Sequence, residues 1–314
     1  MPFLSLLLVA AGILLLFGGG EGLVRGATSI AQRFGMSSLV VGLTVVAFAT
    51  SAPELAASLT AALTGAPDIA VGNVLGSNVA NLALILGVAA LARPIPVAAS
   101  FVKGEIPVMI VVTLLLAPML LDDLIGRGEG VLLLLVLALY LGFLLVQKSR
   151  TGGAGVSESL QESPLPLRRA ILAVGLGGLG LVVGAKLLIT GAVEIAQSFG
   201  ISDRVIGLTL VALGTSLPEL ASSLVAARHG EGDIVLGNII GSNVFNVACI
   251  LGTTAVVIPI PAVDPGTPHD LAVVVGLSIA LPLLLLPNGR LGRVAGGLLL
   301  LAYGLYVGVL FAGF

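Results

Sequence analysis

The feature that most constrains this chain is a series of ten apolar runs, each long enough to cross a bilayer as a helix. Lipid offers no hydrogen-bond partners to an open backbone, and each run is longer than a barrel strand needs. The sequence therefore predicts an all-α membrane protein with ten transmembrane helices. The first run has no basic segment before it and no cleavage-like end, so we interpret it as a span. The runs lie near residues 3–24, 38–64, 69–91, 105–121, 129–147, 168–190, 203–227, 234–258, 270–287 and 292–312.

Composition supports this class. Charged residues make up 10% of the 314 residues, whereas soluble domains carry about 25%. This excludes a soluble enzyme, a disordered chain and a nucleic-acid binder, and it leaves the lipid bilayer as the expected partner, with no obligate protein partner evident. One cysteine, Cys249, and two distant histidines, His229 and His269, argue against a disulfide framework or a zinc site. We expect no cofactor.

The chain contains an internal repeat. Residues 31–87 align without gaps on residues 196–252, and 35 of the 57 positions are identical. A polar, Gly/Ser-rich segment at 148–167 separates a first five-helix repeat, 1–147, from a second, 168–314. Five spans is an odd number, so the second repeat must be inverted relative to the first. Inverted repeats are typical of transporters, in which the two halves build a binding site where they meet.

Lysine and arginine indicate the orientation. With the N-terminus outside, the inner loops hold 11 of these residues and the outer loops hold two, Arg127 and Arg204. The positive-inside rule favours this arrangement. We expect a multi-pass protein of the cell membrane (plasma or bacterial inner membrane), with both termini outside and the 148–167 linker cytoplasmic.

Two glutamates lie deep in apolar runs. Glu54 and Glu219 occupy equivalent places in the second and seventh runs, where a charge costs about 2.5–3.5 kcal/mol even on the lenient insertion scale. A structural ion pair with Lys186, the only basic residue deep in a run, would leave one glutamate unexplained. We therefore favour a mobile cation that neutralises both.

The neighbours of these glutamates suit a hard cation. Thr50 and Ser51 precede Glu54 by four and three residues, which places all three on one helix face. Pro53 cannot donate a hydrogen bond, so it frees the carbonyl of Ala49 and loosens that of Ala47. Such oxygens suit Ca²⁺ or Na⁺ better than soft metals. Back-bonding to the preceding turn is the alternative for a lone hydroxyl. The second half repeats the pattern with Ala212, Gly214, Thr215, Ser216, Pro218 and Glu219.

A second motif, G-N-x-x-G-S-N-x-x-N, begins at Gly72 and again at Gly237. Asn73, Ser77 and Asn81 are spaced by four, so they form a polar stripe that we expect to face the carboxylates. The glycines of the motif can also bring helices close together. Asn238, Ser242 and Asn246 form the same stripe in the second half.

These motifs resemble a known family. ATSAPELAAS with GNVLGSNVANLALILG, and GTSLPELASS with GNIIGSNVFNVACILG, are similar to the α1 and α2 repeats of the calcium/cation antiporter superfamily, in particular its prokaryotic sodium/calcium exchanger branch. The resemblance covers nearly the whole chain and implies four cation sites at the midplane. It implies that Ca²⁺ and Na⁺ share the carboxylates of Glu54 and Glu219, and that Asn81 and Asn246 are polar residues of the middle site. It also implies backbone-carbonyl ligands at Ala47 and Ala212. The implied hydroxyl or carbonyl ligands are Thr50, Thr215, Ser51, Ser216, Ser77 and Ser242.

Position 246 departs from part of the family. Some relatives, notably the potassium-dependent branch, have Asp where this chain has Asn246. The departure argues against K⁺ co-transport and removes one possible charge. We expect the amides of Asn81 and Asn246 to donate to Glu54 and Glu219 and to coordinate cations through their oxygens.

The expected function is secondary active antiport of Ca²⁺ against Na⁺ by alternating access. The alternatives are H⁺/Ca²⁺ exchange by the same fold, because protons would also neutralise the glutamates, and a cation channel, which usually closes its pore by symmetry between subunits. An intramembrane protease needs a Ser–His pair or a histidine metal site. Both histidines are expected in loops, so we do not expect an enzyme.

The orientation can be tested by labelling. We expect a cysteine placed in the 151–163 segment to react with impermeant reagents only from the cytoplasmic side, because the bias in Lys and Arg puts this segment inside. Labelling from outside in intact cells would overturn the topology while leaving the fold prediction in place.

Overall fold

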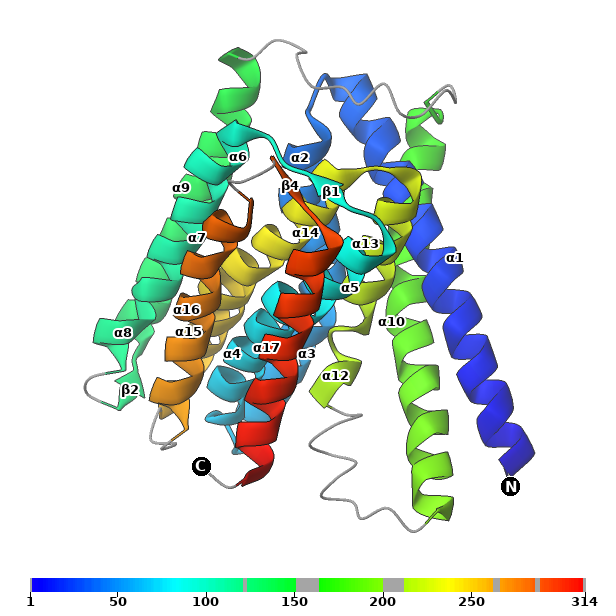
Figure 1. The fold of residues 1–314 in the computed structure, drawn as a ribbon. Coiled ribbons are helices and arrows are strands. Elements are labelled where there is room, and N and C mark those ends of the chain that lie inside the picture. Colours follow the sequence, from blue (N-terminus) through cyan, green and yellow to red (C-terminus); the bar gives the residue numbers. More distant parts are fainter. Residues whose placement is uncertain are drawn as a thin grey trace.

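The computed structural model describes residues 2–120, 123–150, 164–199, 212–261, 266–285 and 289–312. It is a bundle of tilted helices (Figure 1). Within the described residues, nine helical stretches are long and apolar enough to cross a membrane. Part of the seventh expected run, 203–227, lies outside the described residues.

The first half contains five such stretches. They are α1 (Pro2–Phe34); α2 (Ser38–Val41), η1 (Gly42–Val46) and α3 (Ala47–Leu63); α4 (Ile69–Val79), η2 (Ala80–Ile85) and α5 (Leu86–Ala92); α6 (Ala99–Lys103), α7 (Glu105–Leu114) and α8 (Leu116–Met119); and α9 (Arg127–Arg150).

The second half follows the same order. It consists of α10 (Leu167–Ser198); α12 (Ala212–Gly214) and α13 (Leu217–His229); α14 (Gly232–Phe245), η4 (Asn246–Leu251) and α15 (Gly252–Val257); α16 (Thr267–Leu285); and α17 (Arg293–Ala312).

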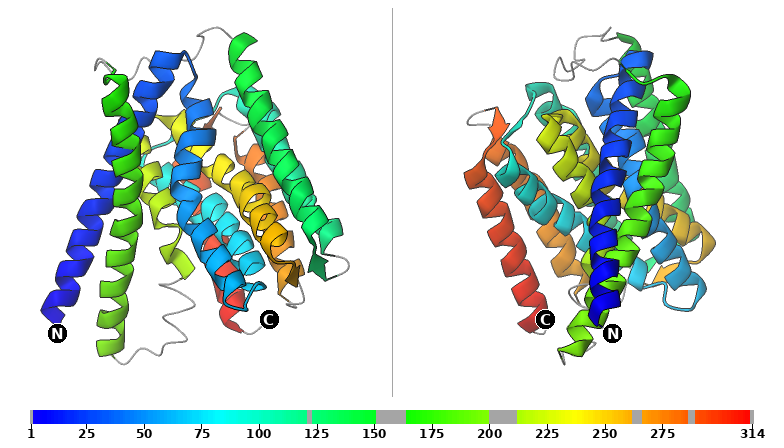
Figure 2. Two further views of the ribbon diagram at one scale, coloured as in Figure 1. Left: turned by 180° about the vertical axis from the view of Figure 1, so that it is seen from behind. Right: turned by 90° about the vertical axis from the view of Figure 1, so that its right-hand side faces the viewer.

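The inversion of the two halves is visible in the chain path. Helix α1 rises from the end marked N toward the opposite side, whereas its repeat equivalent α10 runs the other way, and the two lie side by side at one edge of the bundle (Figure 2). Two short strand pairs also join the halves. Strand β1 (Ile95–Pro96) pairs with β4 (Arg290–Leu291), and β2 (Leu124–Ile125) pairs with β3 (Ile260–Pro261). Each pair takes one strand from each half.

Helices α1 and α10 are longer than the sequence predicts. They contain 33 and 32 residues, against expected apolar runs of 3–24 and 168–190. The apolar run ends where polar residues begin, but helix formation continues to Phe34, and α1 ends before Gly35, whose φ is 59°. At 1.5 Å per residue, each helix exceeds the roughly 30 Å apolar core of a bilayer.

The two histidines do not lie in loops, as the sequence predicted. His229 is the last residue of α13, and His269 lies in the first turn of α16.

Basic residues gather on one side of the bundle. The side chain of Arg93, which follows α5, donates to the carbonyl of Arg228 at the end of α13 (2.9 Å), and His229 contacts Glu21 of α1 (2.8 Å). Arg33 donates to the carbonyl of Leu165, just before α10. We call this side, which also carries the β1–β4 pair, the basic face. It lies opposite the two chain ends (Figure 1).

Glycines set the distance between α1 and α10. A Cβ added at Gly177 would lie 2.7 Å from the carbonyl oxygen of Gly19, and one added at Gly19 would lie 2.7 Å from that of Gly177. Real side chains do not tolerate such distances, so the two backbones touch through glycine, as in other membrane helix pairs. This contact makes α1 and α10 an antiparallel pair along the edge of the bundle.

We predict that Gly177→Val destabilises the protein, because the new side chain must push α1 and α10 apart. Overpacking of this kind usually costs about 1–3 kcal/mol. The matched control is Gly175→Val on the same helix, where no described atom lies within 4 Å of an added Cβ. Thermal unfolding in detergent, followed by size-exclusion chromatography, should show a lower midpoint for Gly177→Val alone. Equal midpoints would contradict the glycine contact.

Candidate cation site

The two buried glutamates come together from opposite halves. Glu54 lies on α3 and Glu219 on α13, and each is 1% exposed. Ser51, one turn before Glu54, donates from Oγ to Oε1 of Glu219 over 3.2 Å. A hydroxyl of one half therefore contacts the carboxylate of the other, as the shared site requires.

The ion pair with Lys186, which the sequence left as an alternative, does not form. Lys186 lies exposed on α10, and none of the described residues forms an ion pair with it. Neither Glu54 nor Glu219 has a basic partner within the described part of the chain. The ion pair with Lys186 is therefore not formed, and none of the described basic residues balances the two formal negative charges.

Thr50 connects α3 to the second polar motif. Its Oγ1 lies 3.2 Å from the carbonyl of Ala47, which is the back-bonding geometry, and 3.1 Å from Oδ1 of Asn238 on α14. The Nδ2 group of Asn238 donates in turn to Ser222 and Ser223 of α13, each at 3.1 Å. Asn238 thus links α3 to α13, a role that the stripe pattern did not predict.

Four asparagines form a second link between the halves. Asn81 donates from Nδ2 to Oδ1 of Asn243, and Asn246 donates from Nδ2 to Oδ1 of Asn78, both over 3.0 Å. Asn78 also donates to the backbone carbonyl of Asn243 (3.3 Å). The expectation that Asn81 and Asn246 donate to the glutamates is therefore wrong. Their amide hydrogens bind the neighbouring asparagines, and this leaves each Oδ1 free to point elsewhere.

Many oxygen atoms of the predicted site are buried without a partner. Within the described residues, seven of the twelve predicted site residues have a buried side-chain oxygen that makes no hydrogen bond. Buried polar atoms are normally satisfied, so a cluster of exceptions needs an explanation. The atoms are all oxygens, the ligand type that Ca²⁺ and Na⁺ prefer. They are Glu54 Oε2, Glu219 Oε2, Asn81 Oδ1, Asn246 Oδ1, Thr215 Oγ1, Ser216 Oγ and Ser242 Oγ.

The remaining predicted residues fit less uniformly. Ser77 is buried on α4, and Ala47 is buried at the start of α3. Ala212 begins the short helix α12. Ala47 thus shares α3 with Glu54, and Ser77 shares α4 with Asn73 and Asn78, whereas α12 carries neither a glutamate nor an asparagine. The role of each of the three residues stays a prediction.

The two halves differ around their prolines. Pro53 lies inside the continuous helix α3, so its missing N–H leaves a free carbonyl one turn earlier, as expected. In the second half the helix stops at Gly214 and a new one, α13, begins at Leu217 with Pro218 in its first turn. A proline is readily accepted there. Thr215 and Ser216 consequently lie in a turn, where the sequence predicted a second kinked helix.

The π-helical segments were also missed. Segment η2 begins at Ala80, beside Asn81, and η4 begins at Asn246. Such wide turns occur often at functional sites. The only sequence signal for them, and for the roles of Asn78 and Asn243, is the exact repetition of the G-S-N-x-x-N motif in both halves.

Comparison with known proteins agrees with this arrangement. The chain matches the family described as "Sodium/calcium exchanger protein" over residues 4–146 and 169–312. It is 42% identical to a putative antiporter CaxA of Alkalimonas amylolytica, over 97% of this chain and 98% of that protein. It is 31% identical to the sodium/calcium exchanger MaX1 of Methanosarcina acetivorans, over 99% of both chains.

Solved structures give the same result. The structure of the sodium-calcium exchanger NCX_Mj soaked with Na⁺ and Sr²⁺ superposes with a TM-score of 0.83, covers 98% of this chain and 99% of its own, and is 34% identical in sequence. The ten-span arrangement in two inverted halves is therefore that of an exchanger fold. The chain belongs to the sodium/calcium exchanger family.

Proposed function

We propose that this protein exchanges Ca²⁺ for Na⁺ through one shared site built on Glu54 and Glu219, near the middle of the membrane. The observation that carries the proposal is the cluster of buried, unpartnered oxygens around two carboxylates that have no described basic partner. A bound cation would give the unpartnered oxygens an ion to coordinate, and it would neutralise the negative charge of the two carboxylates.

Charge explains why the ions exchange. Glu54 and Glu219 together carry two negative charges, which one Ca²⁺ neutralises. Na⁺ ions bind the same carboxylates with help from the hydroxyl and amide oxygens, so the two ions compete. An empty dianionic site is too costly to enclose in the membrane core, so only a loaded site can pass between the two open states. The result is exchange without leak.

The long helices provide the moving part. Helices α1 and α10 pack mainly on each other and reach the rest of the bundle chiefly through α13. Sliding of this pair along the core would open the site to one side and then to the other, as alternating access requires. The core itself is held by the asparagine contacts between α4, η2, α14 and η4.

Proton-coupled Ca²⁺ exchange is the second candidate, because protons can neutralise both glutamates. The hydroxyl and amide oxygens favour Na⁺, since a proton needs no such ligands. Uptake of ⁴⁵Ca²⁺ into proteoliposomes with an outward Na⁺ gradient, a pH gradient or neither separates the two. We expect uptake with the Na⁺ gradient. Uptake with the pH gradient alone would assign the protein to proton exchange.

We predict that Glu54→Gln and Glu219→Gln each reduce Na⁺-driven Ca²⁺ uptake to the background of empty vesicles. The amide keeps the shape of the side chain and removes one of two site charges. Glu129→Gln at the start of α9, where the side chain accepts only from the nearby Gly126 N–H, is the control. Equal elution profiles would confirm that all variants fold. Near-normal exchange in either glutamate variant would rule out the site.

We predict that Asn246→Asp slows Ca²⁺-for-Na⁺ exchange at neutral pH. The new carboxylate would face Oδ1 of Asn78, which now accepts a hydrogen bond from residue 246, and it would add a third charge beside the glutamates. Alternatively, the variant should require another bound cation, H⁺ or K⁺. In either case, acidic pH, which protonates the new group, should reduce the defect. Flux is measured across a pH series with and without K⁺. Profiles that overlay the wild type would mean that position 246 does not face the ions.

A further inference from the structure

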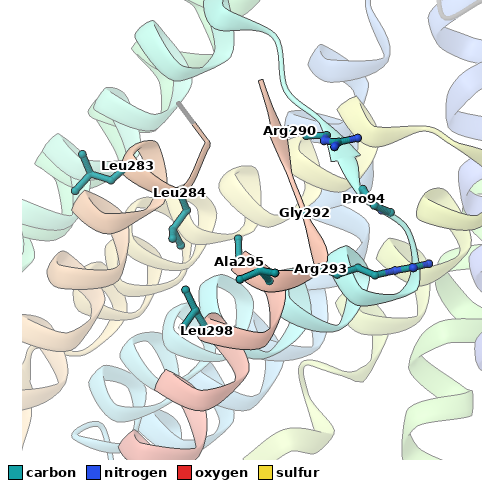
Figure 3. Close-up of a pocket in the computed structure, with 9 residues that line it drawn as sticks. Pro94, Leu283, Leu284, Arg290, Gly292, Arg293, Ala295 and Leu298 are labelled. Atoms are coloured by element: carbon teal, nitrogen blue, oxygen red, sulfur yellow. The ribbon is translucent and has the colours of Figure 1, made fainter. Parts of the chain in front are cut away.

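We propose that an anionic phospholipid binds in a groove between α16 and α17 at the basic face. The groove has a volume of about 500 Å³ and lies where β4 leads into α17. Figure 3 shows its lining: leucines of α16 and α17 lie toward one side, and Arg290, Arg293 and Pro94 lie toward the other. Nothing in the exchange mechanism uses this groove.

The apolar side of the groove is suited to an acyl chain. Leu283 of α16 and Leu298 of α17 are 65% and 52% exposed, and Leu284 and Ala295 line the space between them. In a membrane these exposed side chains face lipid. The two helices pack mainly on other elements, α16 on α4 and α7 and α17 on α5 and η2, so the space between their ends stays open.

The polar side is suited to a phosphate group. The side chain of Arg290 is exposed and makes no contact that the described residues show, and Arg293 uses only Nε, which donates to the carbonyl of Leu91 (3.2 Å). None of the described residues that line the groove is acidic. Guanidinium groups without carboxylate partners are well matched to a phosphodiester. Positive charge next to an apolar wall therefore selects an amphiphile that carries a phosphate.

The internal repeat makes this assignment sharper. The strand equivalent to β4 in the first half is β2, where Leu124 takes the place of Arg290. Asp122 and Asp123 stand just before it in the sequence. The inverted copy therefore keeps one arginine, Arg127 at the start of α9, but lacks the second and has acidic residues next to it in the sequence. Anionic lipids are concentrated in the cytoplasmic leaflet, and the proposed orientation puts the basic face there.

Binding would act on the core of the protein. Arg293 already joins α17 to the end of α5 through Leu91, and β4 is paired with β1, which follows α5. Helix α5 continues from η2, which carries Asn81. A phosphate bound by both Arg290 and Arg293 would hold β4 and the start of α17 in place beside α5. Because the lipid binds the folded protein, binding should raise its thermal stability by mass action.

The test uses the purified full chain in a neutral detergent. We expect phosphatidylglycerol to raise the unfolding midpoint, and phosphatidylcholine and inorganic phosphate to leave it unchanged. Arg290→Gln, which removes no described contact, should weaken the apparent affinity for phosphatidylglycerol about tenfold, as expected for loss of one charge-assisted hydrogen bond. Arg290→Gln with Arg293→Gln should abolish the shift. Lys103→Gln, on the same face but outside the groove, is the control.

Three outcomes would overturn the proposal. They are an equal shift with phosphatidylcholine, an equal shift with inorganic phosphate, and an unchanged phosphatidylglycerol shift in Arg290→Gln. The midpoint of each variant without lipid reports its folding. The readout needs no transport, so its failure would leave the proposed exchange function intact, and loss of exchange in the glutamate variants would leave the lipid site intact.

Discussion

Two buried carboxylates with no basic partner among the described residues are the constraint on which the rest of this structure depends. Glu54 and Glu219 come from opposite halves of the chain, and both are buried. Burying a charged carboxylate in the membrane costs free energy, and neither α3 nor α13 provides a basic partner that would offset it. The surrounding polar groups satisfy one another only in part, and several of their oxygens are buried without a hydrogen-bond partner. An interior of this kind is stable only with a bound cation or with protons, which makes ion occupancy part of the folded state.

The inverted repeat provides the geometry. Asn81 and Asn246 are equivalent, as are Asn78 and Asn243, and each hydrogen-bonded pair takes one member from each half. The amide that donates across the interface is thereby fixed in direction, and its oxygen is presented on the other side. The same motif, present once in each inverted half, thus orients the side-chain oxygens of Asn81 and Asn246 by equivalent hydrogen bonds.

Much of this could be predicted from sequence because charge and hydropathy have strong local signals. The apolar runs predicted the spans, and a carboxylate within a run marked the candidate site before any contact was known. The asparagine contacts could not be predicted, since an amide can donate or accept and only its three-dimensional neighbours decide. Helix ends were also poorly predicted: α1 continues past its apolar run until Gly35, because hydropathy measures lipid preference and not helix formation. The break at Thr215 and Ser216 could not be predicted either, because the nearly identical segment of the first half forms the continuous helix α3.

The paired strands have a consequence for biogenesis. Strand β1 emerges from the ribosome nearly two hundred residues before β4, and β2 well over a hundred before β3, so each early strand remains an open edge until the second half is made. These two strand pairs therefore form only after the second half has been made. Each half provides the strands that pair with those of the other, so the two strand pairs depend on both copies of the repeat.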